Sequence, residues 1–251
     1  MTSPSSWQGH VALVTGATTG IGEAVAYALA DMGISVIVSG RRIERLEAVA
    51  QTIRLKGVKA YTIACDIGDP AAVEGLFARI SNDIGRLDVL INNAGMGYKS
   101  DIGSFANEDL GRALNVNVMG AAICVREALR LMGHRANTAI ITISSMAAHR
   151  VPPGGFGLYA ATKHALRAIM EALRVECVQQ GSQTKIANIS PGTVATEFHK
   201  LFARSDDDPT ANLPFEKLSP DDIADAVKYI LSTPDHVQVN EMLIRPIGQL
   251  G

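Results

Sequence analysis

Two side chains that can exchange protons, Tyr159 and Lys163, lie four residues apart in the stretch YAATK. On a helix this spacing puts both side chains on one face and within reach of each other. A free phenol has a pKa near 10, so proton transfer near neutral pH requires that pKa to fall by about two to three units. The Lys163 ammonium, together with a second nearby positive charge, can favour the phenolate. We therefore expect Tyr159 to act as a general acid and base.

A serine pair precedes this motif, in the stretch ISS that ends at Ser145. The Ser145 hydroxyl can hydrogen-bond a substrate oxygen and stabilise the charge that develops on it, with Ser144 as the neighbouring alternative. In isolation, a tyrosine on an alanine-rich helix is more often a packing residue, and a lone lysine is more often solvated. The combination of Ser145, Tyr159 and Lys163 favours the catalytic interpretation.

A glycine-rich stretch, TGATTGIG, joins the first expected strand to a helix. Gly16 permits the tight turn, Gly20 lets a ligand approach the backbone, and Gly22 allows close packing of the helix. The N-terminus of the helix offers unpaired N–H groups and the positive end of a dipole, which suit a pyrophosphate. A purely structural turn is the alternative for this element alone. The predicted cofactor contacts of this loop are Gly16, Thr18, Thr19, Gly20, Ile21 and Gly22.

The second expected strand ends at Gly40 and is followed by Arg41 and Arg42. An acidic residue at this point would accept hydrogen bonds from the ribose of NAD(H), whereas arginine suits a 2′-phosphate. The sequence therefore predicts NADP(H) as the cofactor. The alternative is that the two arginines solvate a helix start or pair with Glu44 and Glu47.

The third expected strand ends in Asp66 and Ile67. These residues could contact the adenine through a side-chain acceptor and an apolar edge. As a plain helix-capping residue, Asp66 would be unremarkable.

Short β-rich runs alternate with longer amphipathic stretches along the chain, which predicts βαβ units and a parallel sheet. The fold class is α/β, a doubly wound (Rossmann) and mostly parallel seven-stranded sheet with helices on both faces, in a single catalytic domain over residues 1–251. The segment 197–218 mixes aromatic, polar and turn residues and is expected to be a substrate lid. The expected strands are 11–15, 34–40, 59–65, 87–92, 139–144, 185–190 and 237–246, and the later helices span about 108–133, 159–180 and 220–232.

Composition excludes several classes of protein. The 251 residues carry 23 Lys and Arg against 25 Asp and Glu, so we expect no nucleic-acid partner. No stretch is apolar for the length that a membrane span requires, and the N-terminus lacks the pattern of a leader, so we expect no membrane partner and a cytoplasmic location. The three cysteines are widely separated without CxxC spacing, which predicts neither a disulfide framework nor a metal site.

The whole chain resembles the short-chain dehydrogenase/reductase family. The matching motifs are TGATTGIG (15–22), NNAG (92–95), NVNVMG around Asn117, ISS (143–145), YAATK (159–163) and PGTVAT (191–196). The resemblance implies a catalytic set of Asn117, Ser145, Tyr159 and Lys163, in which Asn117 holds a water next to the lysine. It also implies cofactor contacts from Tyr159 and Lys163 and from Asn93, Ala94, Gly95, Pro191, Gly192, Val194 and Thr196.

Two details depart from the family pattern. The loop between Ser145 and Tyr159 is one residue longer than usual, and Thr19 stands where many NADP-using members carry a basic residue. The first departure affects the shape of the substrate pocket. The second leaves the NADP(H) preference to Arg41 and Arg42.

The stretches SSMAAHRVPP and MLIRPIGQ are similar to an NADP-preferring branch that contains animal ketosteroid and carbonyl reductases, insect farnesol dehydrogenase and bacterial 3-hydroxy acid dehydrogenases. The expected function is NADP(H)-dependent interconversion of a ketone or aldehyde and its alcohol. The lid residues Phe198, Leu201, Phe202 and Phe215 favour a moderately apolar small-molecule substrate. A 3-hydroxy acid dehydrogenase and a catalytically silent NADP(H) sensor are the alternatives. The family also implies a homotetramer, or a homodimer, formed through the helices 108–133 and 159–180.

Overall fold

The computed structural model describes residues 7–133 and 135–250, so part of the N-terminal stretch in which we expect no leader lies outside the described residues. Its centre is one seven-stranded sheet in the order β3-β2-β1-β4-β5-β6-β7, in which every neighbouring pair is parallel. The doubly wound fold is therefore confirmed, and the sheet is wholly parallel. The strands are β1 Val11–Thr15, β2 Ser35–Gly40, β3 Ala60–Ala64, β4 Val89–Asn92, β5 Ala139–Ile143, β6 Lys185–Pro191 and β7 Glu241–Ile244.

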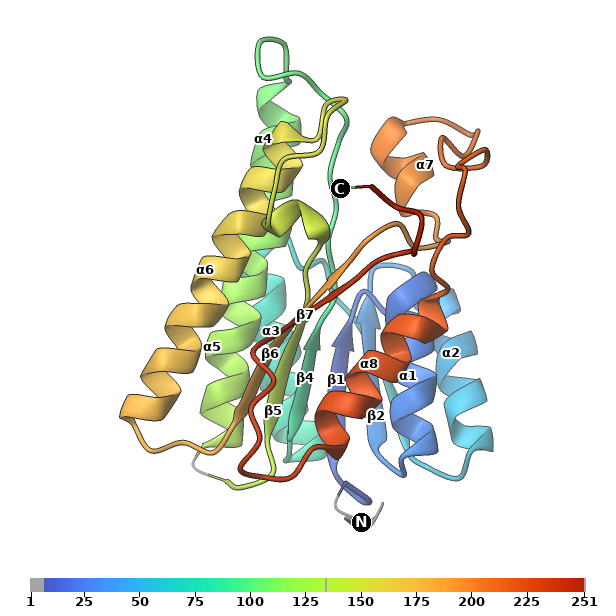
Figure 1. Cartoon of the computed structure of the whole chain (residues 1–251). Helices are drawn as coiled ribbons and strands as arrows, with labels where there is room; N and C mark the ends of the chain where they lie inside the picture. Colours follow the sequence, from blue (N-terminus) through green and yellow to red (C-terminus); the bar gives the residue numbers. More distant parts are fainter. Residues whose placement is uncertain (1–6, 134, 251) are drawn as a thin grey trace.

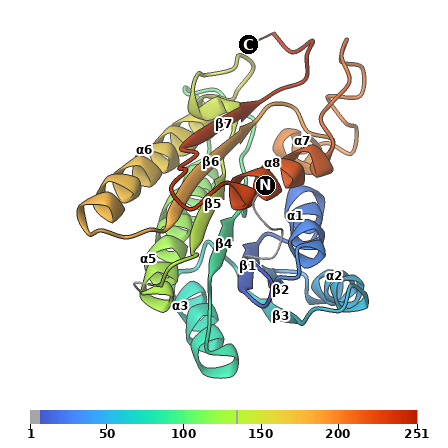
Figure 2. The same ribbon diagram turned by 60° about the horizontal axis from the view of Figure 1, so that its bottom comes forward.

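Helices cover both faces of the sheet (Figures 1 and 2). One layer contains α1 (Gly20–Asp31), α2 (Ile43–Leu55) and α8 (Pro220–Ser232). The other contains α3 (Pro70–Arg79), α5 (Ala121–Met132) and α6 (Gly157–Gln179). The short helices α4 (Asn107–Leu114) and α7 (Phe198–Ala203) lie at the upper end of the molecule in Figure 1.

Each face of the sheet has its own hydrophobic core because side chains alternate along each strand. Along β1, Ala12 and Val14 belong to the core beneath α1 and α8, whereas Val11 and Leu13 belong to the core beneath α3, α5 and α6. All five residues of β1 are buried. Burial on both faces explains why the strands are continuous apolar runs in the sequence.

Two elements differ in detail from the prediction, and a third contains the same irregularity as one of them. The expected helix 108–133 consists of α4, a π-helical segment η2 (Asn115–Gly120) and α5. The helix α3 likewise passes into a π-helical segment, η1 (Ile80–Ile84), before it ends at Gly85. The last strand is β7 alone, and residues 237–240 precede it outside the sheet. Each π-helical segment is about one turn long, too short for the hydrophobic pattern to show a period of its own.

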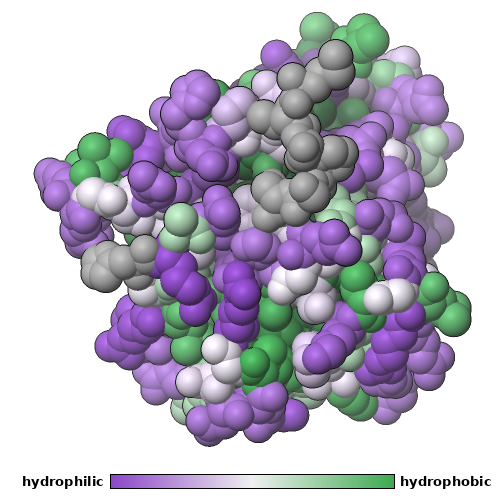
Figure 3. Space-filling view, turned by 90° about the horizontal axis from the view of Figure 1, so that it is seen from below, coloured by the Kyte–Doolittle hydropathy of each residue, from purple (hydrophilic) through white to green (hydrophobic). Residues whose placement is uncertain are grey.

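The carboxyl ends of all the strands lie at one edge of the sheet, which is the upper edge in Figure 1. The opposite face of the molecule is mostly hydrophilic, with hydrophobic residues in small groups (Figure 3). No helix among the described residues is long and apolar enough to cross a membrane. The segments that follow the strands therefore all begin at one edge of the sheet, where ligands bind in open α/β sheets.

Candidate active site

A single cavity of about 480 Å³ lies at the carboxyl ends of the strands and extends from the glycine loop to α6. Its volume is in the range of small-molecule sites. Ser145 and every predicted cofactor contact line it, whereas Asn117 is absent from its wall. The predicted contacts in the wall are Gly16, Thr18, Thr19, Gly20, Ile21, Gly22, Arg41, Arg42, Asp66, Ile67, Asn93, Ala94, Gly95, Tyr159, Lys163, Pro191, Gly192, Val194 and Thr196.

Two glycines of the glycine loop lie so close to neighbouring atoms that their positions leave no room for a side chain. Gly16 has φ of 66°, and a Cβ atom there would lie 2.9 Å from Ala94 Cα. A Cβ atom on Gly22 would collide with the Gly16 carbonyl oxygen and with Asn93. In the described structure the side chain of Thr19, which precedes α1, makes no capping bond to the start of that helix. The first N–H groups of α1 are therefore available to an anion in the cavity.

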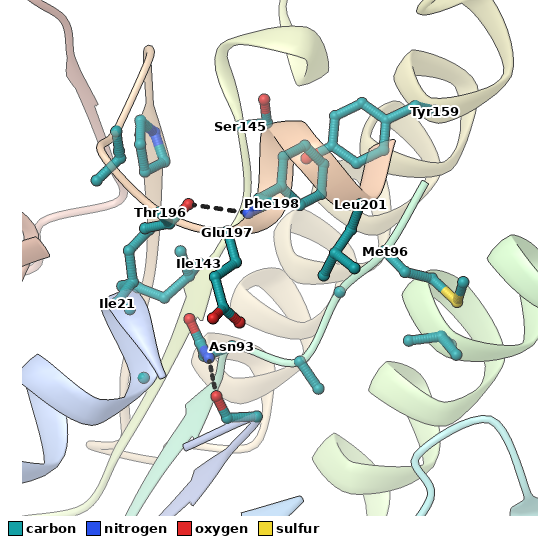
Figure 4. Close-up of a pocket in the computed structure, with 18 of the residues that line it drawn as sticks. Ile21, Asn93, Met96, Ile143, Ser145, Tyr159, Thr196, Glu197, Phe198 and Leu201 are labelled. Carbon is teal, nitrogen blue, oxygen red and sulfur yellow. Dashed lines mark hydrogen bonds between the residues drawn. The ribbon is translucent and has the colours of Figure 1, made fainter. Parts of the chain in front are cut away.

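Hydrogen bonds of Asn93 and Thr15 hold this loop in place. The Asn93 side-chain amide donates to the carbonyl oxygens of Thr15 at 2.9 Å and Gly16 at 3.2 Å, and Thr15 Oγ1 accepts from the N–H groups of Asn93 and Ala94 at 3.0 Å. Figure 4 shows the Asn93 amide turned toward the loop. Asn93 thus lines the cavity, but its side chain is committed to holding the loop in place.

Arg41 and Arg42, which follow β2, line the cavity at the end away from Tyr159. Arg42 Nη2 donates to Thr18 Oγ1 at 2.9 Å, which fixes its guanidinium beside the glycine loop. Arg42 Nη1 also lies 3.9 Å from Glu197 Oε2, and Glu47 pairs with Arg54. In the described structure Arg42 therefore pairs with neither Glu44 nor Glu47, the partners named in the alternative interpretation. The positive charge of Arg41 contributes to lowering the pKa of the Asp66 carboxyl group.

Asp66 is held by Arg112 of α4. The two Asp66 carboxylate oxygens accept from Arg112 Nη2 at 2.6 and 2.7 Å, and Oδ1 also accepts from the Gly68 N–H at 2.9 Å. Partial burial raises the pKa of Asp66, but the bonds from Arg112 and Gly68 outweigh it, so the pKa is lowered. Asp66 is therefore an ionised, oriented acceptor in the cavity wall rather than a plain helix cap.

Tyr159 lies in the first turn of α6 and is 7% exposed. Its ring packs against Phe198 and Phe202, with ring centroids 5.4 and 5.8 Å away. Figure 4 shows the tyrosine ring beside Phe198, on the same side of the cavity as Ser145. The phenol is thus held in an apolar pocket that opens toward Ser145.

The pKa of Tyr159 differs from the expected decrease. Burial raises it to about 12, and a hydrogen bond with Ser145 lowers it only in part. Burial also lowers the pKa of Lys163 to about 8. Both shifts have one cause, since a low-dielectric pocket disfavours the charged form of each group. The residues of this chain alone therefore keep the phenol protonated at neutral pH.

Lys163 lies one helical turn after Tyr159. Its Nζ is 5.7 Å from the centre of the tyrosine ring and donates to the carbonyl oxygen of Ile143 at 3.3 Å. A Cβ atom on Gly95 would lie 3.3 Å from this Nζ. The glycine of NNAG thus leaves the space that the ammonium group occupies.

Asn117 is buried within η2, behind the cavity wall. Its amide nitrogen donates to the Met96 carbonyl oxygen at 2.6 Å and to Thr162 Oγ1 at 2.9 Å, and its Oδ1 accepts from the Met96 N–H at 2.9 Å. The side chain therefore ties the segment after NNAG to α6. Its predicted part in a water relay stays a prediction.

The two serines after β5 have different environments. Ser145 Oγ accepts from the Ala147 N–H at 3.1 Å, at the start of the 3₁₀ turn η3 (Met146–Ala148). Ser144 Oγ is buried and has no hydrogen-bond partner among the described residues. The geometry thus separates Ser145 from its neighbour, which the sequence could not do.

Only two of the four apolar residues named for the lid line the cavity. Phe198 and Leu201 line the cavity, whereas Phe202 is 3% exposed and stacks on Phe156 behind Tyr159 at 4.3 Å. Phe215 is also absent from the wall; its side chain approaches Gly248 near the C-terminus. The apolar surface beside Tyr159 is therefore smaller than the count of lid aromatics suggests.

Several residues of the cavity wall were not predicted: Met96, Arg112, Arg150, Glu197 and Gln249. Arg150 and Gln249 lie in the stretches SSMAAHRVPP and MLIRPIGQ, and Glu197 begins the expected lid, but no motif gives any of the five a role in the site. The tertiary fold brings them to the cavity. Among the described residues, no group of three or more histidine, cysteine, aspartate or glutamate side chains could hold a metal ion.

The chain is similar over nearly its whole length to known oxidoreductases. It is 38% identical to dehydrogenase/reductase SDR family member 11 of Mus musculus, with 97% of this chain and 96% of that protein covered. It is 36% identical to farnesol dehydrogenase of Aedes aegypti, with 97% and 98% covered. The structure of a serine dehydrogenase complexed with NADP⁺, in its closed form, superposes with a TM-score of 0.87 at 30% identity, with 96% of each chain covered.

Residues 10–206 match the family described as short chain dehydrogenase. This segment contains the glycine loop, the arginines after β2 and the Ser145, Tyr159 and Lys163 side chains. The match and the relatives agree with the fold and with the contents of the cavity. The chain therefore belongs to the short-chain dehydrogenase family.

Proposed function

We propose that this protein is an NADP(H)-dependent oxidoreductase that interconverts a ketone or aldehyde and the corresponding alcohol. The observation that carries the proposal is that Ser145, Tyr159 and Lys163 share one cavity with the glycine loop and with Arg41 and Arg42. A dinucleotide that reaches from the arginines toward Tyr159 would contact both ends of this cavity.

The residues of the cavity fit NADP(H). The uncapped N-terminus of α1 can receive the pyrophosphate, and Arg41 and Arg42 can receive a 2′-phosphate through charge-assisted bonds. Asp66, fixed by Arg112, is an oriented acceptor for an amino group such as that of adenine. The NADP⁺ complex of the similar serine dehydrogenase supports this assignment.

In the proposed mechanism, the bound nicotinamide supplies or accepts the hydride and, when oxidised, adds a positive charge near Tyr159. Ser145 donates a hydrogen bond to the substrate oxygen and keeps it beside the phenol. Tyr159 gives its proton to that oxygen during carbonyl reduction and takes it back during alcohol oxidation. Lys163 stabilises the phenolate and returns a proton to it.

The raised pKa of Tyr159 gives the two directions different pH dependences. A phenol with a pKa of about 12 is protonated at neutral pH and ready to donate. Oxidation needs the phenolate, whose population rises as the pH approaches that pKa. We therefore expect alcohol oxidation to accelerate with increasing pH through the range 7–10, whereas carbonyl reduction should stay nearly constant, because the phenol remains protonated over the same range.

The surroundings of Tyr159 favour a moderately apolar substrate. Phe198, Leu201 and Met96 line this end of the cavity, and Pro152 and Phe156 contribute from the loop after Ser145. The similarity to a farnesol dehydrogenase agrees with this preference.

A 3-hydroxy acid is the second candidate substrate because of one observation. Arg150 lines the cavity, and its Nη2 is buried without a hydrogen-bond partner among the described residues. A substrate carboxylate would supply the missing acceptor, since a buried unpaired donor is costly. The likeness to a serine dehydrogenase supports testing this class.

A homotetramer is a further part of the proposal. Leu114, Met119, Val175 and Val178 are large apolar side chains with exposed fractions between 39% and 67%, on α4, η2 and α6. A second copy that packed on these helices would remove this surface from water. Light scattering coupled to gel filtration measures the assembly, and a monomeric mass at micromolar concentration would contradict it. A cytoplasmic location stays a prediction.

The function is tested by following NADPH and NADH consumption with ketosteroids, farnesal, aryl ketones and 3-oxo acids. We expect the wild type to prefer NADPH and to reduce at least one of these classes. With that substrate, Ser145→Ala should reduce kcat/KM by about 100-fold, as expected for the loss of a preorganised donor. The control Ser39→Ala should lose far less, because the Ser39 hydroxyl is buried in β2 and is absent from the cavity wall.

Two outcomes would contradict the proposal. Equal losses in the two serine variants would remove Ser145 from the mechanism. Tight NADPH binding without turnover of any carbonyl would favour the catalytically silent sensor. A preference for 3-oxo acids that Arg150→Met abolishes would select the hydroxy acid candidate.

A further inference from the structure

The lid begins with a carboxylate that points into the cavity. Glu197 follows Thr196 directly and precedes the first residue of α7, Phe198. Figure 4 shows its side chain extending toward the side of Asn93, away from the Phe198 ring, which lies beside Tyr159. Glu197 therefore belongs to the cofactor end of the cavity although it starts the segment that covers the substrate end.

Two arginines at the start of α2 face this carboxylate. Glu197 Oε2 lies 3.9 Å from Arg42 Nη1, and Glu197 Oε1 lies 3.5 Å from Arg45 Nη1. Arg42 precedes the first residue of α2, and Arg45 lies in its first turn. The contact joins parts of the chain that are more than 150 residues apart in the sequence.

The Arg42 guanidinium cannot turn freely to a new partner. Its Nη2 donates to Thr18 Oγ1, and only its Nη1 faces Glu197. A phosphate that approached from the cavity would meet the same Nη1 group. The carboxylate and a phosphate would therefore compete for one position on Arg42.

The ion pairs of Glu197 with Arg42 and Arg45 are weak enough for a more highly charged anion to displace the carboxylate. The side chains of Glu197, Arg42 and Arg45 are 51%, 46% and 48% exposed, and exposed ion pairs at such distances are weak. A 2′-phosphate carries up to two negative charges and three acceptor oxygens, and arginine binds it through two parallel bonds. The phosphate should displace the carboxylate.

We propose that Glu197 is an internal counter-ion of the 2′-phosphate site: its carboxylate neutralises Arg42 and Arg45 in the cofactor-free protein, and it competes with the 2′-phosphate of NADP(H) for them. The proposal rests on the proposed function, because it assumes that Arg42 receives this phosphate. It makes Glu197 a residue that determines how strongly the site discriminates between NADPH and NADH.

The proposal has a definite sign. Removal of the Glu197 charge frees Arg42 and Arg45 and should tighten NADPH binding. NADH lacks the 2′-phosphate, so its affinity should change little. If Glu197 instead accepted hydrogen bonds from the ribose hydroxyls, removal of its charge would weaken NADH binding.

The experiment measures the dissociation constants of NADPH and NADH by calorimetric titration of wild type, Glu197→Gln and Glu216→Gln. Glu216 is an exposed carboxylate in the same lid segment, and it is absent from the cavity wall and from the ion pairs of the described residues. It is therefore a matched control for the loss of one lid charge. Titrations at 20 and 300 mM salt show whether any change is electrostatic.

We expect Glu197→Gln to bind NADPH roughly two- to fivefold more tightly at 20 mM salt, with a smaller gain at 300 mM, as for removal of an exposed ion pair. NADH binding, and both affinities of Glu216→Gln, should stay within about 1.5-fold of wild type. Unchanged or weaker NADPH binding, or an equal change for NADH, would overturn the proposal. A wild type with no preference for NADPH would instead overturn the cofactor assignment in the proposed function, so the two failures are distinguishable.

Discussion

The two ends of the cavity are built on different principles. At the cofactor end, the wall is backbone: Gly16 and Gly22 lie so close to their neighbours that an added methyl group would collide with Ala94 or Gly16. At the substrate end, the wall is side chain: Tyr159 packs among phenylalanines, and Lys163 is 3% exposed in the interior. The first end depends on shape and the second on buried ionisable groups.

This difference separates what each end contributes. Backbone N–H groups and glycines bind any dinucleotide of the right shape and change little with pH. A buried phenol and a buried lysine, by contrast, carry pKa values of about 12 and about 8. Stability, pH dependence and chemistry should therefore be coupled at the substrate end and nearly independent of one another at the cofactor end.

The largest effect is expected from Lys163→Met, which removes the charge and keeps the length of the side chain. Loss of the group that supports the tyrosine should reduce kcat by about 100- to 10,000-fold. The folded protein should nevertheless become more stable, since burial lowers the pKa of Lys163 from 10.5 to about 8 and so opposes folding by roughly 3 kcal/mol at neutral pH.

The pH dependence of this stability has a defined sign. Between about pH 8 and 10.5 the unfolded state binds a proton that the folded state does not, so the free energy of unfolding of the wild type rises with pH. The advantage of Lys163→Met should be greatest below pH 8 and fade toward pH 10.5. Urea titrations at pH 7 and 10 measure it; a variant less stable than wild type at pH 7 would show that burial does not strain the lysine.

The next effect tests the cofactor end. Gly22→Ala puts a Cβ atom against the Gly16 backbone and Asn93, so the glycine loop must shift. We expect NADPH affinity to fall by about 100-fold or more and the free energy of unfolding to fall by about 1–3 kcal/mol, as for overpacking.

Gly75→Ala is its matched control. Gly75 lies within α3, and nothing lies within 4 Å of an added Cβ. Here alanine should leave NADPH binding unchanged and raise the free energy of unfolding by about 0.5–1 kcal/mol through helix propensity. Calorimetric titration and urea unfolding give both quantities. Similar NADPH affinities in the two variants would contradict the role of close packing in the loop.

A smaller effect is expected from Arg41→Asp. The substitution removes a charge-assisted bond to the 2′-phosphate and adds a carboxylate, so the KM for NADPH should rise about 10- to 100-fold. The KM for NADH should change far less. The exposed Arg79 of α3, which pairs with Asp83, provides the control Arg79→Asp. Unchanged selectivity in Arg41→Asp would remove Arg41 from the cofactor site.

The sequence predicts the cofactor end better than the substrate end for a physical reason. Glycines at a strand-to-helix turn, and charges after a strand, act through the local chain, so a short motif contains the whole arrangement. All the predicted contacts of this end accordingly line the cavity. What the motif could not contain is Glu197, which reaches Arg42 and Arg45 only through the tertiary fold.

At the substrate end, the sequence identifies the residues but not their environment. The spacing of Tyr159 and Lys163 places both on one face of α6, yet the direction of the tyrosine pKa shift depends on burial by Phe198 and Phe202. The count of lid aromatics likewise includes Phe202, which packs against Tyr159, and Phe215, which lies beside Gly248, although neither lines the cavity. The π-helical segment around Asn117 is only six residues long, too short for the hydrophobic pattern to show a period of its own.

The central claim is that Tyr159 transfers the proton in a cavity that binds NADPH independently of it. The most direct test measures NADPH affinity and the single-turnover rate of carbonyl reduction in Tyr159→Phe, with the substrate found for the wild type. We predict an NADPH dissociation constant within about threefold of wild type and a rate about 100- to 10,000-fold lower, because only the proton donor is lost. A Tyr159→Phe variant that binds NADPH and retains the wild-type rate would contradict the account.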